Sequence, residues 1–195
     1  MPSGSLSLNA YGYPLLIKHL LTKSNIASVC QEIVSGTDMR LSYADLGKRV
    51  CQLANSLKTE GILEGMRVGV MDWDTHLYLE CFFAVPMMGA TLFTINIRLS
   101  PAQVLYTINH SQSDLIIVHQ DFMTLIDDIK SGFNRDIIIL TIGNGEGYER
   151  WIGAASDSFD FPDFDENQTA TLFYTTGTTG KPKGVSYSHR QLVLH

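Results

Sequence analysis

The residues best suited to chemistry in this sequence form one short stretch, residues 174–185, which reads Tyr-Thr-Thr-Gly-Thr-Thr-Gly-Lys-Pro-Lys-Gly-Val. Its glycines permit backbone conformations that other residues avoid and let the chain approach a ligand closely. Successive backbone N–H groups in such a loop can form a concave anion site, to which threonine hydroxyls add donors and lysines add positive charge. The apolar run at residues 172–174 is typical of a strand that leads into the loop. The stretch therefore predicts a loop that binds a polyphosphate.

This loop differs from the P-loop of many kinases and ATPases. That motif requires G-x-x-x-x-G-K-[ST], in which the hydroxyl residue after the lysine contacts Mg²⁺. Here Pro182 follows Gly180-Lys181, and the position five before Gly180 is Thr175 instead of glycine. A kinase-type site is therefore disfavoured, and its signature would be transfer of the γ-phosphate without release of pyrophosphate. A flexible Gly/Thr linker is disfavoured by the strand before the loop and by its Lys-Pro-Lys-Gly exit.

The same stretch closely resembles the phosphate-loop signature of the AMP-forming adenylating enzymes, which include acyl-CoA synthetases, firefly luciferase and peptide-synthetase adenylation domains. The usual pattern is Tyr-Thr-Ser-Gly-Thr-Thr-Gly-x-Pro-Lys-Gly-Val, and Thr176 stands here where serine is commoner. Weaker resemblances follow in the family's order at residues 41–46, 65–70 and 85–90. The resemblance implies that residues 1–195 are the N-terminal portion of an AMP-binding (adenylation) domain, with residues 174–185 as its phosphate loop.

The resemblance also implies an activity in two steps. A carboxylate attacks the α-phosphate of Mg·ATP to give an acyl-adenylate and pyrophosphate, and the thiol of coenzyme A (CoA) then displaces AMP. Residues 73–84 and 94–101, with the step Asn96-x-Arg98-Leu99, resemble medium- and long-chain fatty acyl-CoA ligases more than activators of acetate or amino acids. The implied small molecules are a fatty acid, ATP, Mg²⁺ and CoA, and a homodimer is one option in this subgroup. A relative that activates an aromatic or amino acid is the alternative within the same superfamily.

The first step requires that phosphates are positioned and neutralised, and the resemblance assigns this task to the loop. The residues it implies as contacts to the ATP phosphates are Thr175, Thr176, Gly177, Thr178, Thr179, Gly180, Lys181 and Lys183. Thr175 is also the candidate to support Mg²⁺. For Lys181, solvation is the alternative interpretation. Three glycines make the empty loop entropically loose, which predicts that it is mobile without nucleotide.

The sequence holds no complete catalytic set. By the resemblance, the adenine- and ribose-binding motifs, the Mg²⁺-binding glutamate motif, the acyl pocket and a mobile domain with the catalytic lysine all lie downstream. Lys181 and Lys183 are therefore not assigned the role of that lysine. A capping box, Ser188 with Gln191, opens a helix that is cut at His195, so we expect a fragment that is inactive alone. A natural short protein that binds a nucleotide or a partner without catalysis is the alternative.

Composition limits the partners and the compartment. A net charge of −6 argues against nucleic acid and anionic membrane surfaces, but not against a nucleotide, which needs only local positive charge. Cys30, Cys51 and Cys81 are odd in number and widely spaced, which predicts a reducing compartment and no structural metal. Residues 1–5 lack the features of a signal peptide, and residues 15–21 are too short and too charged to span a bilayer. A cytoplasmic location is expected.

Strand and helix patterns alternate along the chain and predict an α/β domain with a largely parallel sheet flanked by helices, incomplete at its C-terminus. The predicted strands are residues 29–34, 67–71, 91–95, 114–118 and 137–140. The predicted helices are residues 15–22, a helix that Ser42 opens and Gly61 ends, residues 75–88, a helix from Ser100-Pro101, and a helix over residues 122–129.

Residues 143–167 form a different region, which we interpret as a surface excursion before the chain returns to the sheet. Its acidic residues could form a metal site, but the interleaved Phe159, Phe161 and Phe164 favour a solvated loop held by its aromatic side chains. For His189, at the start of the last helix, the two interpretations are a place in the acyl pocket and a local structural role, of which the second is favoured.

Overall fold

A computed structural model of the chain describes residues 12–21, 31–36, 39–143, 146–175 and 180–195. The strands are β1 (Glu32–Ser35), β2 (Met39–Ser42), β3 (Arg67–Met71), β4 (Thr91–Thr94), β5 (Leu115–His119), β6 (Ile138–Ile142), β7 (Thr169–Thr175) and β8 (Lys183–Ser188). The helices are α2 (Tyr43–Thr59), α3 (His76–Met87), α4 (Pro101–Ser111), α5 (Met123–Ile129), α6 (Glu146–Gly153) and α7 (His189–Leu194). Residues 18–21 are also helical, within the predicted helix at residues 15–22.

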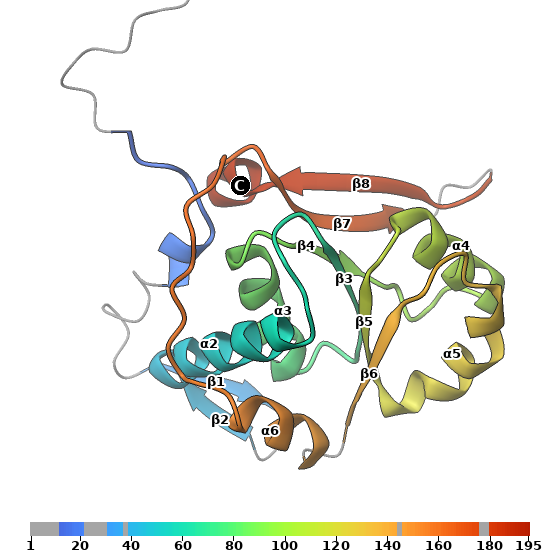
Figure 1. Cartoon of the computed structure of the whole chain (residues 1–195), viewed down its shortest axis with the longest axis horizontal. Coiled ribbons are helices and arrows are strands. Elements are labelled where there is room, and N and C mark those ends of the chain that lie inside the picture. Colours follow the sequence, from blue (N-terminus) through green and yellow to red (C-terminus); the bar gives the residue numbers. More distant parts are fainter. Residues whose placement is uncertain (1–11, 22–30, 37–38, 144–145, 176–179) are drawn as a thin grey trace, which may run out of the picture.

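Six strands form one sheet in the order β6-β5-β3-β4-β7-β8 (Figure 1). All neighbours pair in parallel except β7 and β8, which are antiparallel. The largely parallel α/β sheet predicted from the sequence is therefore confirmed. The predicted strand at residues 29–34 lies outside this sheet: β1 pairs with β2 in a separate antiparallel hairpin.

Local sequence signals set the helix boundaries. Ser42, Ser100 and Ser188 each form a capping box at the start of their helix. The serine side chain accepts a hydrogen bond from the N–H of the third helical residue, and the side chain of that third residue accepts one from the serine N–H. Pro86 is accommodated in the last turn of α3, which ends one residue later. No helix in the described parts of the chain has the length and apolarity needed to cross a membrane.

The two faces of the sheet carry separate apolar clusters. On β5, Leu115 and Ile117 join the cluster with α2, α3 and α6, whereas Ile116 and Val118 join the cluster with α4 and α5 (Figure 1). This division follows from the alternation of side chains along a strand. At the centre of the sheet, a Cβ on Gly69 would lie 2.9 Å from Ile116 Cγ2, so this close approach requires glycine.

Residues 143–167 contain a helix that the sequence analysis did not predict. In α6, Tyr148 and Ile152 are buried against the cluster with α2. The chain then runs without regular structure beside α2, where Asn55 Nδ2 donates to the carbonyl oxygens of Ser156 and Ser158, each at 2.9 Å. In the described parts of the chain, no group of three or more His, Cys, Asp or Glu residues could hold a metal ion.

A buried ionic network joins α2, α3 and α6. Arg49 Nε donates to Glu80 Oε1 at 2.6 Å, and its two terminal nitrogens donate to Glu149 at 2.7 and 2.6 Å. The Tyr148 hydroxyl donates to Glu80 Oε2 at 2.7 Å. The Glu80 side chain is 0% exposed, and burial raises its pKa although Arg49 and Tyr148 act to lower it. Arg49 lowers the pKa of Glu149, which is partly exposed.

We expect Arg49→Met to lower the free energy of unfolding by about 3–5 kcal/mol, because it leaves the Glu80 carboxylate buried without its cation. Urea denaturation at pH 8 measures this loss. Protonation relieves a buried carboxylate, so the loss should be smaller at pH 5.

Lys130→Met is the matched control, since its partner Asp127 and the lysine side chain are both 53% exposed. Its cost should stay below about 1 kcal/mol. Equal costs for the two variants would show that the network is not stabilising.

Candidate functional site

The carboxyl ends of β3, β4 and β7 meet at one edge of the sheet, because these strands are parallel neighbours. Ligands of open α/β sheets bind at such edges. The predicted phosphate loop connects β7 to β8, and Thr175 pairs with Lys183 across its base. The described residues on either side of the loop therefore lie at the end of an antiparallel hairpin whose first strand is part of the parallel sheet.

The structure describes half of the eight predicted phosphate contacts. Thr176, Gly177, Thr178 and Thr179 lie outside the described residues. Thr175, Gly180, Lys181 and Lys183 are described and lie together at the hairpin end.

Both lysines of the loop are exposed, which keeps their charge accessible to an anion in solvent. The Lys181 ammonium lies 5.2 Å from the centre of the Tyr106 ring on α4. Gly180 has φ +129, and none of the residues that the structure describes comes within 4 Å of the position of a Cβ there. Buried Pro182 anchors the chain between the two lysines. The described residues thus give a positively charged rim, which can attract an anion such as phosphate.

Tyr174 attaches the end of β7 to the body of the protein. Its ring is 7% exposed and lies edge-on to Phe93, with 5.4 Å between centroids. Its hydroxyl forms a 2.7 Å hydrogen bond with His110 Nδ1 on α4, and burial raises its pKa to about 12. Tyr174 therefore packs at the end of the strand.

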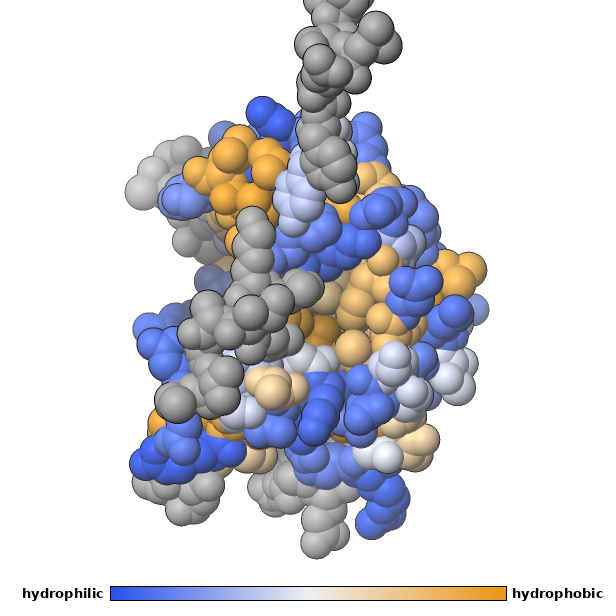
Figure 2. All heavy atoms as spheres, turned by 90° about the vertical axis from the view of Figure 1, so that its left-hand side faces the viewer, coloured by the Kyte–Doolittle hydropathy of each residue, from blue (hydrophilic) through white to orange (hydrophobic). Residues whose placement is uncertain are grey.

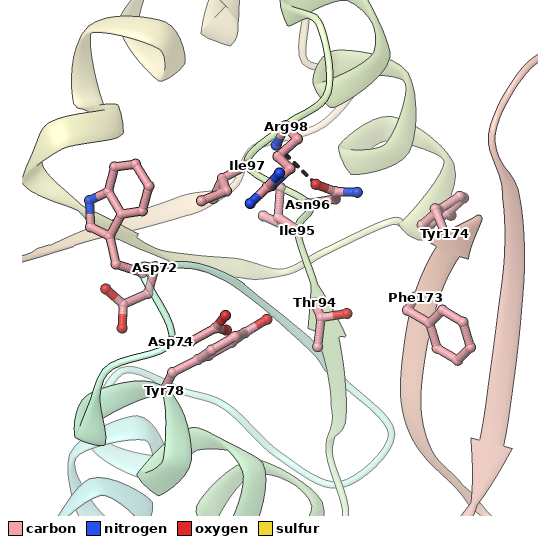
Figure 3. Close-up of a pocket in the computed structure, with 11 residues that line it drawn as sticks. Asp72, Asp74, Tyr78, Thr94, Ile95, Asn96, Ile97, Arg98, Phe173 and Tyr174 are labelled. Carbon is pink, nitrogen blue, oxygen red and sulfur yellow. Dashed lines mark hydrogen bonds between the residues drawn. The ribbon is translucent and has the colours of Figure 1, made fainter. Parts of the chain in front are cut away.

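A polar hollow of about 460 Å³ opens at the same edge (Figure 3). Its lining comes from the segments that follow β3 and β4, from the start of α3 and from the end of β7: Asp72, Trp73, Asp74, Tyr78, Thr94, Ile95, Asn96, Ile97, Arg98, Phe173 and Tyr174. In Figure 3, Asn96 and Arg98 lie on the segment after β4, and Tyr78 lies across the hollow on α3. Asp74 and Tyr78 can therefore accept hydrogen bonds on one side of the hollow, and Arg98 offers a guanidinium on the other.

Asp72 is a residue of this hollow that the sequence analysis did not single out. It is 4% exposed, and its Oδ2 accepts from the hydroxyl and the N–H of Thr75. Its Oδ1 is buried without a hydrogen-bond partner among the described residues. The neighbouring Asp74 has φ +57, a left-handed conformation that is uncommon outside glycine. The sequence signal that could have identified Asp72 is a carboxylate placed directly after a buried strand.

An apolar groove of about 510 Å³ adjoins the hollow and shares Thr94 and Phe173 with it. It lies between α3, the β7–β8 hairpin and α7, and Figure 2 shows apolar residues exposed on this side of the molecule. Its lining residues are Ile17, Leu20, Leu79, Phe82, Phe83, Thr94, Thr171, Phe173, Tyr187 and Leu192.

His189 has a local structural role, as the sequence analysis favoured. The side chain is fully buried, its Nδ1 accepts from the Ile17 N–H at 3.4 Å, and its ring lies 4.7 Å from that of Phe164. Burial lowers its pKa to about 4. His189 thus joins the N-terminal segment to the start of α7.

Comparisons with known proteins agree on one family. The family model described as "AMP-binding enzyme" matches residues 22–195. The 3-methylmercaptopropionyl-CoA ligase of Ruegeria lacuscaerulensis is 33% identical over 93% of this chain and 36% of its own length. The long-chain-fatty-acid–CoA ligase of Thermus thermophilus is 34% identical over 86% of this chain and 31% of its own length.

Solved structures show the same fold. The anthranilate CoA ligase AuaEII, solved in complex with anthranoyl-AMP, superposes with a TM-score of 0.83 at 24% identity, over 91% of this chain and 34% of that one. The chain spans about a third of the length of the curated relatives described above.

Gly180→Ala should lower the free energy of unfolding by about 1 kcal/mol, because φ +129 is unfavourable for a residue with a Cβ. Gly147→Ala is the control, because Gly147 lies in α6 and no positive φ is recorded for it. This change should raise stability by up to about 1 kcal/mol. Denaturant titration of both variants would contradict the argument if the two shifts had the same sign.

Lowering the pH should reduce the unfolding free energy of the wild type more than that of the His189→Gln variant. The unfolded chain binds a proton at His189 near pH 6.5, whereas the folded chain binds it only near pH 4. Between these values the unfolded state holds more protons, so the unfolding free energy falls as pH decreases. By pH 5 the His189 contribution amounts to about 2 kcal/mol. Denaturation at pH 7 and pH 5 measures the difference, and identical losses in the two proteins would refute the assignment.

Proposed function

The chain belongs to the family of AMP-binding enzymes, and we propose that it is the N-terminal part of an ATP-dependent, AMP-forming fatty acid–CoA ligase. The observation that carries this proposal is the β7–β8 hairpin, which presents the Thr/Gly/Lys loop at the carboxyl edge of the sheet. The reaction would convert a carboxylate and ATP into an acyl-adenylate and pyrophosphate, followed by transfer of the acyl group to CoA. The cytoplasm is the proposed location.

The loop residues are proposed to bind and orient the phosphates of ATP. Lys183 and Lys181 would neutralise the β- and γ-phosphates, because both ammonium groups lie at the exposed hairpin end. Thr175, opposite Lys183, would hold Mg²⁺ or the α-phosphate side, and Mg²⁺ would supply neutralisation of the triphosphate charge. Thr176, Gly177, Thr178, Thr179 and Gly180 complete the proposed set.

The proposed substrate is a medium- or long-chain fatty acid. Two relatives, 30% and 34% identical to this chain, are named medium-chain-fatty-acid–CoA ligase and long-chain-fatty-acid–CoA ligase. The apolar groove beside the polar hollow supports this choice, because it offers an apolar surface to an acyl chain next to polar groups. A homodimer stays a prediction.

The test is carboxylate-dependent exchange between ATP and labelled pyrophosphate, made with the protein at its natural length. Octanoate and palmitate should support exchange better than acetate, benzoate or phenylalanine. Exchange that prefers benzoate or phenylalanine would replace the fatty acid by the alternative within the family. ATP hydrolysis to ADP, or nucleotide binding without any exchange, would contradict the ligase.

Residues 1–195 alone should show no exchange, because they span about a third of the length of the ligases they resemble. Measurable exchange by this purified chain would refute that expectation.

Lys183→Ala should raise the KM for ATP by roughly ten- to a hundred-fold, since one hydrogen bond to a charged group contributes about 1.5–3 kcal/mol. Steady-state exchange kinetics measure the change, with Lys130→Ala as the control because that lysine is exposed on the segment after α5. An unchanged KM in Lys183→Ala would remove this residue from the site.

A further inference from the structure

Two residues of α4 with ring side chains lie beside the described residues that enter and leave the phosphate loop. Tyr106 and His110 are one helical turn apart and therefore share a face of α4. Their ring centroids are 5.5 Å apart. We call this pair the α4 platform.

The strand that enters the loop is attached to this platform through Tyr174. The Tyr174 hydroxyl is hydrogen-bonded to His110 Nδ1 at 2.7 Å, and the two rings meet edge to face at 5.7 Å between centroids. Because Tyr174 directly precedes Thr175, the platform fixes the point at which the chain leaves the sheet.

The chain that leaves the loop contacts the same platform. The Lys181 ammonium lies 5.2 Å from the centroid of the Tyr106 ring, which is within the range of a cation–π interaction. The α4 platform thus contacts a residue before the loop and a residue after it. Neither Tyr106 nor His110 is part of the predicted loop motif.

We propose that Tyr106 is a positioning residue for the phosphate loop, and that it holds the Lys181 ammonium beside the loop exit before a nucleotide arrives. The proposal rests on the proposed function, because it concerns the same phosphate site. A lysine side chain has many rotamers, and fixing one of them opposes binding. A ring that already restricts the ammonium removes part of this cost, as preorganisation does in other binding sites.

The test is binding of MgATP to the protein at its natural length, measured by isothermal titration calorimetry. Tyr106→Leu removes the aromatic face and should weaken binding by about two- to five-fold, the strength of an exposed cation–π contact. Tyr106→Phe keeps the face and should bind as the wild type does. Thermal denaturation of each variant checks that it is folded.

Lys181→Gln supplies the decisive comparison, because it removes the charge that Tyr106 is proposed to hold. In this background, Tyr106→Leu should cause no further loss of affinity, whereas a general structural role of the ring would weaken binding as much as before. A loss that persists in the Lys181→Gln background, or an equal loss in Tyr106→Phe, overturns the proposal.

The variant Tyr106→Trp covers the case in which Tyr106→Leu does not fold. Indole is the best cation–π partner, so binding should be at least as tight as in the wild type, and this advantage should vanish with Lys181→Gln. A weaker complex, or an advantage that survives Lys181→Gln, contradicts the proposal.

Binding and exchange are measured separately, so failures of the two proposals are distinguishable. Tight MgATP binding without carboxylate-dependent exchange rejects the proposed ligase activity. The comparison of Tyr106→Leu with and without Lys181→Gln still tests the role of Tyr106. A wild-type protein that binds no MgATP overturns both.

Discussion

Parallel pairing of β4 with β7 is the constraint on which the rest of the site depends. These strands are far apart in the sequence, yet their pairing brings the end of β7 to the edge where β3 and β4 also end. The base of the loop and the polar hollow lie at this edge, and the α4 platform contacts Tyr174 from one face of the sheet. If β7 were displaced by one register position, its alternation would place Tyr174 on the opposite face, away from His110.

The alternation along β7 also divides the surroundings of the loop into two sides. Tyr174 and Leu172 belong to the cluster with α4 and α5, while Phe173 and Thr171 line the apolar groove beside α3. Thr175, two residues after Phe173, is therefore on the same face of β7 as Phe173. The anchoring contact with α4 and the open groove therefore occupy opposite faces of one strand.

The sequence predicted those features that depend on local signals. Helices opened by Ser42, Ser100 and Ser188 begin at these caps, and apolar runs correctly marked β3, β4, β5 and β6. Helix α6 was missed because its burial depends on Tyr148 and Ile152 reaching α2, about a hundred residues away in the chain. The pairing of β1 with β2 outside the main sheet was missed for a similar reason, since an apolar run does not reveal its partner. In the site, the loop was found from its motif, whereas Asp72 gained meaning only when folding left its Oδ1 buried beside the hollow.

The cation in the core and the cations of the phosphate loop have different surroundings. Arg49 is largely shielded from solvent between Glu80 and Glu149, where both carboxylates accept hydrogen bonds from its guanidinium. Lys181 and Lys183 are exposed, and the contact described for Lys181 is with an aromatic face, which carries no net charge. A lysine held by a ring keeps its full charge for an incoming anion, whereas one paired with a carboxylate would first have to break an ion pair. The fold therefore neutralises charge in its core and leaves two exposed lysines at the edge where phosphate is proposed to bind.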